Sequence, residues 1–218
     1  MQGMGFLAIW SDISPEIETD YLHWLTREHT TERVSIPGFL SVRVFRALHV
    51  DVHRFFIHYE LQNADVVGSQ EYLDRLNAPT PWSQRMMPNL GNFVRGGGRV
   101  LASSGTGRGG FIAAIALASA FPGDPQTAIR KLMQMDRIVS VRVFATDDTQ
   151  TSISTSEKSL RAKDSSFKSL LLIEALDESA LAAALRSLPT VVPSLLEAAI
   201  ARPHVYANIY CLDRRLIP

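Results

Sequence analysis

Cysteine is almost absent from this chain, and its charges cancel. The single cysteine, Cys211, can form no disulfide within the chain and cannot by itself build a cysteine-rich metal site. Lysine plus arginine and aspartate plus glutamate number 22 each, so no field of one sign favours nucleic acid or an anionic membrane. The longest apolar stretch, 111–121, is too short to cross a bilayer, and the first residues lack the basic start of a signal peptide. These absences predict a soluble cytoplasmic protein with neither nucleic acid nor membrane as a partner.

What the chain does contain is a repeat. The residues Ser-Val-Arg-Val-Phe occur at 41–45 and again at 140–144. The surroundings match in the same order, with 5–8 (GFLA) answered by 110–113 (GFIA) and 55–60 (FFIHYE) by 170–174 (LLLIE). Matching neighbours in matching order indicate a duplicated unit of about a hundred residues.

Each half has the pattern strand, helix, strand, strand, helix, strand. Alternation and β-branched residues predict strands at 5–11, 39–47, 55–61, 92–102, 110–118, 138–145, 168–175 and 203–211. Helices are expected at 14–30 and 65–76, from 125, at 178–187 and at 193–201. We therefore predict an α+β fold of two tandem ferredoxin-like βαββαβ repeats, 1–104 and 105–218. Their antiparallel sheets are expected to pair into one α+β barrel.

A polar segment, 147–166, interrupts the second repeat between its second and third strands. It is rich in Ser, Thr, Asp and Lys and has few apolar residues. Such a composition offers little apolar burial to offset the entropy of ordering. We expect a mobile hairpin insertion.

Several residues of the first half together resemble a known family. They are Trp10, Trp24, Glu28-His29, Arg33, Ile36-Pro37-Gly38-Phe39 and Tyr59-Glu60. This pattern resembles the dimeric α+β barrel superfamily, and within it small EthD-like or uncharacterised bacterial members. The resemblance is clear over about residues 5 to 102 and is carried by topology in the second half. Members of that superfamily include cofactor-free monooxygenases, lactone isomerases, polyketide cyclases, dehydratases and haem enzymes, so the resemblance implies the fold more strongly than the reaction.

Aromatic and histidine side chains are concentrated in the first half. It holds all three tryptophans, at 10, 24 and 82, and five of the six histidines. This asymmetry predicts one working pocket in the first half and a degenerate second half; the alternative is that the aromatic residues only fill a larger core.

Polar residues shared by both halves have a simpler interpretation. Arg43 matches Arg142 and Glu60 matches Glu174, which predicts a structural Arg–Glu pair in each half.

The first helix supplies the leading catalytic candidates. A 3.6-residue period places Trp24 and Glu28 on its apolar face, with His29 at the edge of that face. A carboxylate aimed into an apolar face tends to have a raised pKa, which suits a general acid or base. The alternative is that Glu28 forms an ion pair with Arg43 or Arg95.

The third strand leaves two orientations open. His58 shares one face with Phe56 and Glu60, and Tyr59 lies on the other. If the first face lines the barrel, His58 lies near Arg43; if the second packs beneath the first helix, Tyr59 can reach Glu28 or His29. The expected catalytic residues are therefore His29, Glu28, Tyr59 and His58. The expected substrate-binding residues are Trp24, Trp82, Trp10, Arg43 and Arg95.

These residues predict an acid–base enzyme without a cofactor, an isomerase, dehydratase or other lyase acting on a small hydrophobic cyclic or aromatic metabolite. The alternatives are a cofactor-free monooxygenase and a non-catalytic binding protein for such a metabolite.

A metal is not expected: His49 and His53 have helical ligand spacing but belong to a hairpin. A haem needs only one histidine, although no feature calls for it. The chain is also compatible with a homodimer.

Overall fold

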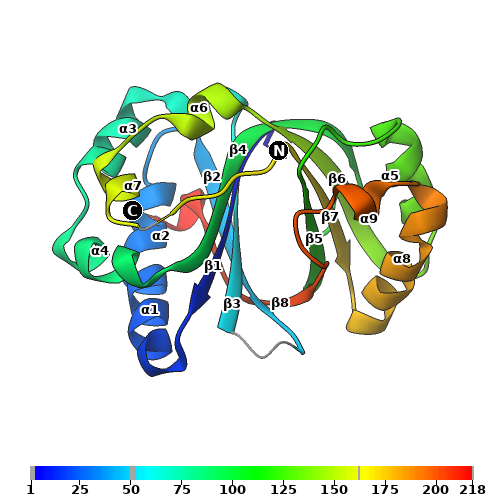
Figure 1. Ribbon diagram of the computed structural model, residues 1–218, viewed down its shortest axis with the longest axis horizontal. Helices are drawn as coiled ribbons and strands as arrows, with labels where there is room; N and C mark the ends of the chain where they lie inside the picture. The colour runs from blue at the N-terminus through cyan, green and yellow to red at the C-terminus, as the bar shows by residue number, and fades with distance from the viewer. Residues whose placement is uncertain (1–2, 50–52, 162, 218) are drawn as a thin grey trace. The chain divides into compact units, whose positions relative to one another are not determined.

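The computed structural model describes residues 3–49, 53–161 and 163–217. Within these residues, eight strands form a closed antiparallel barrel in the order β1-β3-β2-β8-β5-β7-β6-β4 (Figure 1). The strands are β1 (Gly5–Ile13), β2 (Phe39–Ala47), β3 (His53–Leu61), β4 (Gly91–Ser104), β5 (Phe111–Leu117), β6 (Ile138–Thr146), β7 (Ser169–Ala175) and β8 (Val205–Asp213). The first four strands follow the order β4-β1-β3-β2 and the last four the order β8-β5-β7-β6, which is the ferredoxin-like arrangement twice over. The predicted fold is confirmed.

Both repeats carry the same irregularity in their strand pairing. The register between β2 and β3 shifts between Phe39 and Ser41, and the register between β6 and β7 shifts between Ile138 and Ser140. These positions correspond in the repeated sequence. A β-bulge therefore occurs at the corresponding place in both halves.

The chain divides into two compact units that do not coincide with the two repeats. The first consists of Met1–Gly98, Asp147–Ser166 and Ile209–Pro218; the second consists of Arg99–Thr146 and Phe167–Asn208. The polar segment 147–166, expected as an insertion of the second repeat, therefore packs in the first unit.

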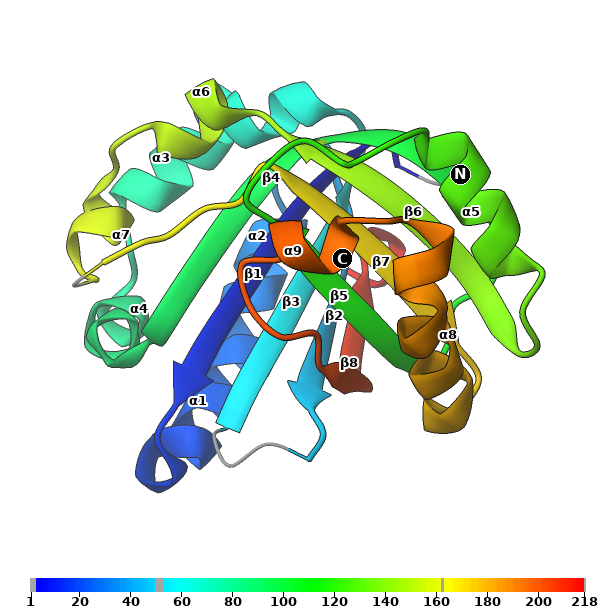
Figure 2. The ribbon, with the colours of Figure 1, turned by 45° about the vertical axis from the view of Figure 1, so that its right-hand side comes forward.

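Helices cover one face of the strands in the first unit (Figure 2). They are η1 (Pro15–Ile17), α1 (Glu18–Trp24), η2 (Leu25–His29), α2 (Thr30–Val34), η3 (Ala64–Gly68), α3 (Gln70–Asn77), α4 (Pro81–Met86) and η4 (Met87–Asn89). Alternate residues of the strands face these helices, so that Leu7 lies opposite Tyr59 and Ile9 opposite Ile57 across β1 and β3. Burying this apolar face stabilises the unit at roughly 25 cal/mol per Å² removed from water.

The segment 147–166 forms two short helices in place of the expected hairpin. They are α6 (Asp148–Ser152) and α7 (Ser156–Ser159), and α7 packs beside α3 (Figures 1 and 2). The buried residues Thr151, Thr155, Glu157 and Arg161 come from this segment. Sequence composition missed this order because polar side chains can be buried when the rest of the fold supplies hydrogen-bond and charge partners.

The second unit has its own helices and core. Its helices are α5 (Pro125–Met133), α8 (Glu178–Val191) and α9 (Leu195–Ala198). Asp124 caps α5 by accepting hydrogen bonds from the amides of Gln126 and Thr127, and Asp177 caps α8 through the amide of Ala180. The helix η5 (Arg214–Leu216) follows β8 and belongs to the first unit.

The predicted Arg–Glu pair is present in the second repeat. Arg142 Nη2 donates to Glu174 Oε1 at 2.8 Å, and both side chains are buried. In the first repeat, Ser41 Oγ donates to Glu60 Oε2 at 3.4 Å, and Arg43 lies over the ring of Phe45. In the second repeat, Arg142 likewise lies over the ring of Phe144.

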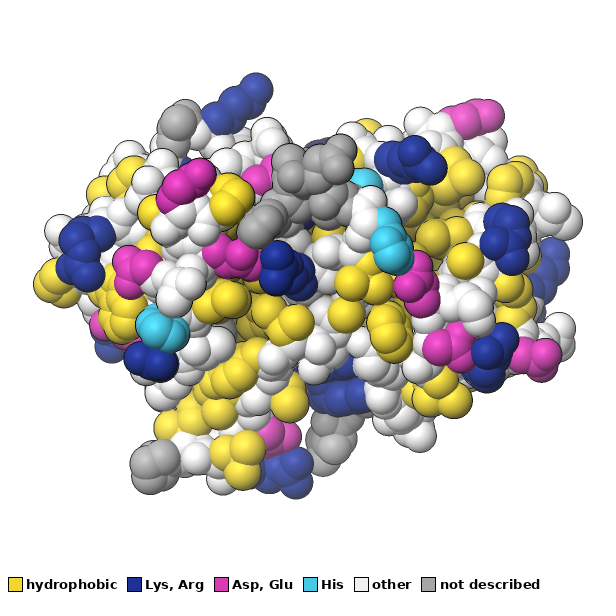
Figure 3. All heavy atoms as spheres, turned by 90° about the horizontal axis from the view of Figure 1, so that it is seen from below, with side chains coloured by type: hydrophobic (Ala, Val, Ile, Leu, Met, Phe, Trp, Pro, Cys, Tyr) yellow, Lys and Arg dark blue, Asp and Glu magenta, His cyan; other side chains and the backbone are white. Residues whose placement is uncertain are grey.

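Surface features agree with the balanced composition. On the face drawn in Figure 3, basic and acidic side chains are interspersed. No helix in the described parts of the chain is both long enough and apolar enough to span a membrane. The turn between His49 and His53 contains residues 50–52, which lie outside the described residues, so the spacing of these histidines is left as a sequence observation.

Candidate active site

A π-helical turn sets which residues of the first helix face the core. In η2 the amide of Thr30 donates to the carbonyl of Leu25, five residues earlier instead of four. This extra residue advances the buried stripe by one position, so His29 follows Trp24 on the inner face. Arg33 lies one turn further along, and all three side chains are buried. Such turns are rare inside α-helices and are frequent at functional sites.

Glu28, the expected centre of the apolar face, is displaced by the same turn. Its Oε1 accepts a hydrogen bond from Thr80 Oγ1 at 2.6 Å, and Thr80 in turn caps α4 by accepting the amide of Ser83. Glu28 is half-buried and is not part of the cavity that contains His29. Its partner is Thr80, where we had expected Arg43 or Arg95.

A cavity of about 30 Å³ lies between the helices and the sheet of the first unit. Its apolar walls come from Leu7, Ile9 and Ile57 on the strands, and its aromatic walls from Trp24, Tyr72 and Phe93. Its polar groups include those of Ser11, Tyr21 and Thr155, and those of His29, Arg33, Tyr59, Arg95, Glu157, Lys158 and Arg161. This volume holds one or two water molecules, so a larger ligand needs some of the lining to move.

His29 is a neutral imidazole inside this cavity. Its side chain is 5% exposed, and its ring lies 4.3 Å from that of Trp24 between centroids. Burial, with the charges of Arg33 and Arg161, holds the pKa of His29 well below its ordinary value of 6.5. Its Nδ1 has no hydrogen-bond partner among the described residues. A neutral imidazole with an open nitrogen in a buried cavity can accept or donate a proton.

Tyr59 presents a second open polar atom to the same cavity. Its side chain is fully buried, and its hydroxyl has no hydrogen-bond partner within the described chain. Burial raises the pKa of Tyr59 above its ordinary value, and Arg33 offsets only part of that effect. The hydroxyl therefore stays protonated and can donate a hydrogen bond to a developing oxyanion. Tyr59 lies on the helix side of the sheet, which is the orientation that allows it to approach His29.

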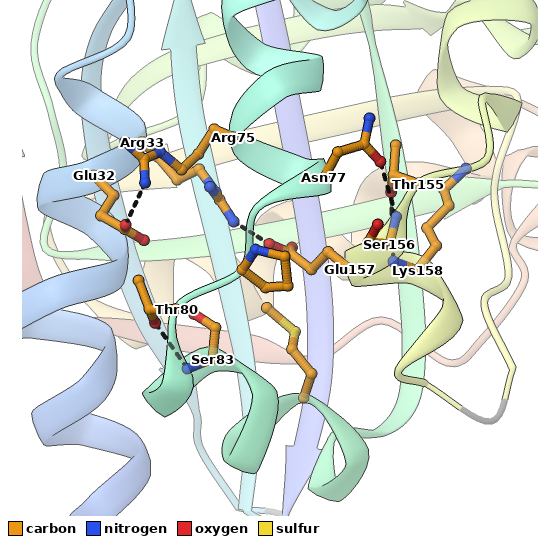
Figure 4. Close-up of polar contacts among 12 residues, drawn as sticks. Glu32, Arg33, Arg75, Asn77, Thr80, Ser83, Thr155, Ser156, Glu157 and Lys158 are labelled. Atoms are coloured by element: carbon orange, nitrogen blue, oxygen red, sulfur yellow. Dashed lines mark hydrogen bonds and ion pairs between the residues drawn. The ribbon is translucent and has the colours of Figure 1, made fainter.

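Arg33 connects the first helix to the segment 147–166. Its Nη2 donates to Glu157 Oε2 from α7, as Figure 4 shows. The exposed fractions are 2% for Arg33 and 6% for Glu157, so the ion pair is buried. Burial alone would lower the pKa of Arg33, but the carboxylate of Glu157 raises it, and the guanidinium stays charged. The second terminal nitrogen, Nη1, has no partner among the residues described.

Arg95, predicted to bind substrate, lines the cavity from β4. Its Nη1 donates to the carbonyl of Thr151 at 3.2 Å, and its Nη2 donates to Tyr72 Oη at 3.3 Å. Arg95 therefore holds α6 and α3 at the edge of the cavity.

The other predicted residues lie elsewhere. Trp10, Arg43 and His58 are on the opposite face of the sheet, where Trp10 packs on Phe56 and Arg43 is opposite His58 in the strand register. Trp82 is half-buried outside the cavity, and its Nε1 donates to Asp20 Oδ1 at 3.2 Å. Of the nine predicted site residues, the cavity therefore brings together Trp24, His29, Tyr59 and Arg95.

Sequence reasoning missed Arg33 and Glu157 as site residues. Arg33 belonged to the family-like pattern, and the π-helical turn that brings it inward has no signature in the sequence. Glu157 comes from a segment that its composition marked as mobile. Among the described residues, no group of three or more His, Cys, Asp or Glu side chains is placed to hold a metal ion.

Comparisons with known proteins support the fold. No protein-family profile and no curated protein sequence matches the chain. Among solved structures, an anthrone oxidase-like protein is 12% identical with a TM-score of 0.62, over 98% of this chain and 94% of that one. A candidate monooxygenase from Fusobacterium nucleatum subsp. nucleatum is 10% identical with a TM-score of 0.54, over 98% and 96% of the two chains. A candidate chlorite dismutase is 11% identical with a TM-score of 0.54, over 95% and 96%. At these identities the similarity shows a shared α+β barrel fold, and the EthD-like assignment stays a prediction.

Proposed function

We propose that this chain is an enzyme that moves a proton on a small cyclic or aromatic metabolite, with His29 as the base. The observation that carries the proposal is that His29 Nδ1 and Tyr59 Oη line one cavity and are both buried without a partner among the described residues. A buried polar group left unpaired costs about 1–3 kcal/mol, and a ligand that pairs with both groups would remove that cost.

The two groups have complementary roles in such a reaction. His29 removes a proton from an acidic C–H or O–H bond of the bound metabolite, and the resulting imidazolium can return the proton to a second position. Tyr59 donates a hydrogen bond to the substrate oxygen on which negative charge develops. The aromatic rings of Trp24 and Tyr72 pack on the flat ring of the substrate, and the charges of Arg33 and Arg95 favour an anionic intermediate. Isomerisation and elimination both begin in this way.

The fold comparison favours a second candidate, a cofactor-free monooxygenase. Two of the similar structures are named for oxidase-like or monooxygenase chemistry. In this version the carbanion formed by His29 reacts with dioxygen. For anthrone, the sum is anthrone plus dioxygen giving anthraquinone plus water, and the metabolite itself supplies the electrons.

The test uses two ketones with acidic C–H bonds, 2-indanone and anthrone. Under argon in D₂O, the proposal predicts that the chain accelerates deuterium incorporation next to the carbonyl of 2-indanone, measured by NMR. His29→Gln should lower that rate at least about 100-fold, as expected for loss of a general base. Trp82→Phe, outside the cavity, is the matched control and should keep the rate.

The same experiment separates the candidates. Oxygen consumption with anthrone in air, lost in His29→Gln, supports the monooxygenase. Binding of 2-indanone with no exchange of its protons contradicts catalysis and favours a binding protein.

A further inference from the structure

The segment 147–166 closes the cavity of the first unit mainly through polar contacts. Thr151 Oγ1 accepts the amide of Gly97 at 3.2 Å, and the amide of Ser156 donates to Asn77 Oδ1 at 3.0 Å (Figure 4). Glu157 of the same segment pairs with Arg33. Hydrogen bonds and ion pairs can be exchanged for equivalent contacts with a ligand or water, whereas apolar burial cannot.

The pair Arg33–Glu157 has an unusual arrangement for a purely structural contact. Both side chains are buried, so their desolvation offsets much of their attraction. Arg33 uses Nη2 for Glu157, and its Nη1 has no partner in the described chain. Arg33 lines the same cavity as His29 and Tyr59. A guanidinium can hold a carboxylate through two parallel hydrogen bonds. Arg33 is therefore a carboxylate site that Glu157 fills incompletely.

Basic side chains outnumber acidic ones in the lining of the cavity, which favours binding of an anion. Arg33, Arg95, Lys158 and Arg161 all line it, and Glu157 is the acidic residue of the lining. Asp164, outside the lining, holds Arg161 through two hydrogen bonds of 2.7 Å. Movement of Glu157 away from the cavity would leave the buried Arg33 without its counter-ion, so what replaces Glu157 must itself be acidic.

We propose that Arg33 binds the carboxylate of an aromatic acid and that Glu157 occupies this position until the ligand displaces it. The exchange replaces one buried ion pair by another and removes a side chain from a cavity that otherwise has room for one or two water molecules. It also breaks the tie between Arg33 and α7, so binding loosens the segment 147–166. The inference rests on the proposed function in placing the ligand in the cavity of His29, and it adds the acidic group as a condition for binding.

Benzoate is the probe, with benzyl alcohol as its uncharged counterpart. Glu157→Gln removes the competing carboxylate, and isothermal titration should show benzoate binding at least about tenfold tighter than in the unaltered chain. Glu32→Gln is the matched control, because Glu32 pairs with Arg75 outside the cavity and acts on Arg33 less strongly than Glu157 does, and it should raise the affinity much less than Glu157→Gln. In the double variant Arg33→Met/Glu157→Gln, the gain should be lost. Unchanged or weaker benzoate binding by Glu157→Gln overturns the proposal.

A second measurement uses the unaltered chain and does not depend on how the variants fold. Trypsin can cut the segment after Lys158, Arg161 and Lys163. Benzoate should speed the appearance of peptides ending at these residues, detected by mass spectrometry, and benzyl alcohol should not. Equal cleavage with and without benzoate overturns the displacement of Glu157. Neither measurement requires turnover, so a failure of 2-indanone exchange leaves this result standing and is recognised separately.

Discussion

The rings of Trp24 and His29 pack 4.3 Å apart between centroids, although five positions separate them in the chain. In a regular α-helix, residues three or four apart share a face. The π-helical turn Leu25–His29 adds one residue and brings these two rings together above the sheet. The placement of the candidate base therefore depends on a local departure from helical geometry.

Glu28→Gln tests the consequence of that departure. Glutamine keeps an oxygen that can accept the hydrogen bond from Thr80, and position 28 does not line the cavity. We expect the rate of 2-indanone exchange to stay within about threefold of the original and the free energy of unfolding to change by less than about 1 kcal/mol. A loss of exchange comparable to that of His29→Gln would show that Glu28 takes part in the chemistry.

His29 should make the fold sensitive to acid. Because its pKa in the folded chain is lower than in the unfolded chain, protonation favours unfolding. The free energy of unfolding should be fully maintained above about pH 6.5. Below that pH it should fall by up to about 1.4 kcal/mol per pH unit from this residue, until the folded pKa is reached.

Urea unfolding at pH 7.5 and pH 5.5 measures the effect of His29. His29→Gln should lose less stability between the two values than the unaltered chain. The same substitution at His23, outside the cavity, should leave the difference as it was. An identical pH dependence in His29→Gln would contradict the neutral buried state of this histidine.

Tyr59→Phe should separate stability from activity. The substitution removes a buried hydroxyl that has no partner among the described residues, and it keeps the ring. We expect the free energy of unfolding to stay the same or to rise by up to about 2 kcal/mol, and the exchange of 2-indanone to slow at least about tenfold. Thermal unfolding and NMR exchange measure the two quantities. Lower stability with full activity would mean that the hydroxyl serves the fold.

The pair Arg142–Glu174 in the second repeat should behave as a structural contact. Arg142→Met removes the guanidinium that pairs with the fully buried Glu174 and should lower the free energy of unfolding by about 3–5 kcal/mol. The double variant Arg142→Met/Glu174→Leu should recover most of that loss, and urea unfolding of the three chains measures it. Neither variant should affect 2-indanone exchange in the fraction that is folded.

The order of strands and helices could be predicted from sequence because it depends on local patterns. The repeated stretch around Arg43 and Arg142 and the alternation along the strands each mark an element without knowledge of the rest of the chain. The tandem ferredoxin-like topology followed from these marks. Boundaries moved where tertiary packing decided them, as in the first helix, which runs on to Val34 beyond the expected end near Thr30.

The site was harder to predict because its residues are brought together by structural features that have no signature in the local sequence. A period of 3.6 residues pointed to Glu28, and one additional residue in the helix transferred that position to His29. Tyr59 could be assigned only as one of two alternatives, since alternation along a strand does not tell which face the helices cover. Glu157 could not be predicted as a site residue without knowing that Arg33 and Arg95 form polar contacts with the segment 147–166, which is distant in sequence.

The cavity of the first unit also depends on the segment 147–166 of the second repeat. This segment is encoded within the second repeat, yet it completes the cavity of the unit built mostly from the first. The first copy alone, separated from the second, would lack Glu157, Lys158 and Arg161 and would leave Arg33 facing solvent. A chain that lost its second half would therefore lose these three residues of the cavity lining, so the cavity of the first unit depends on both repeats.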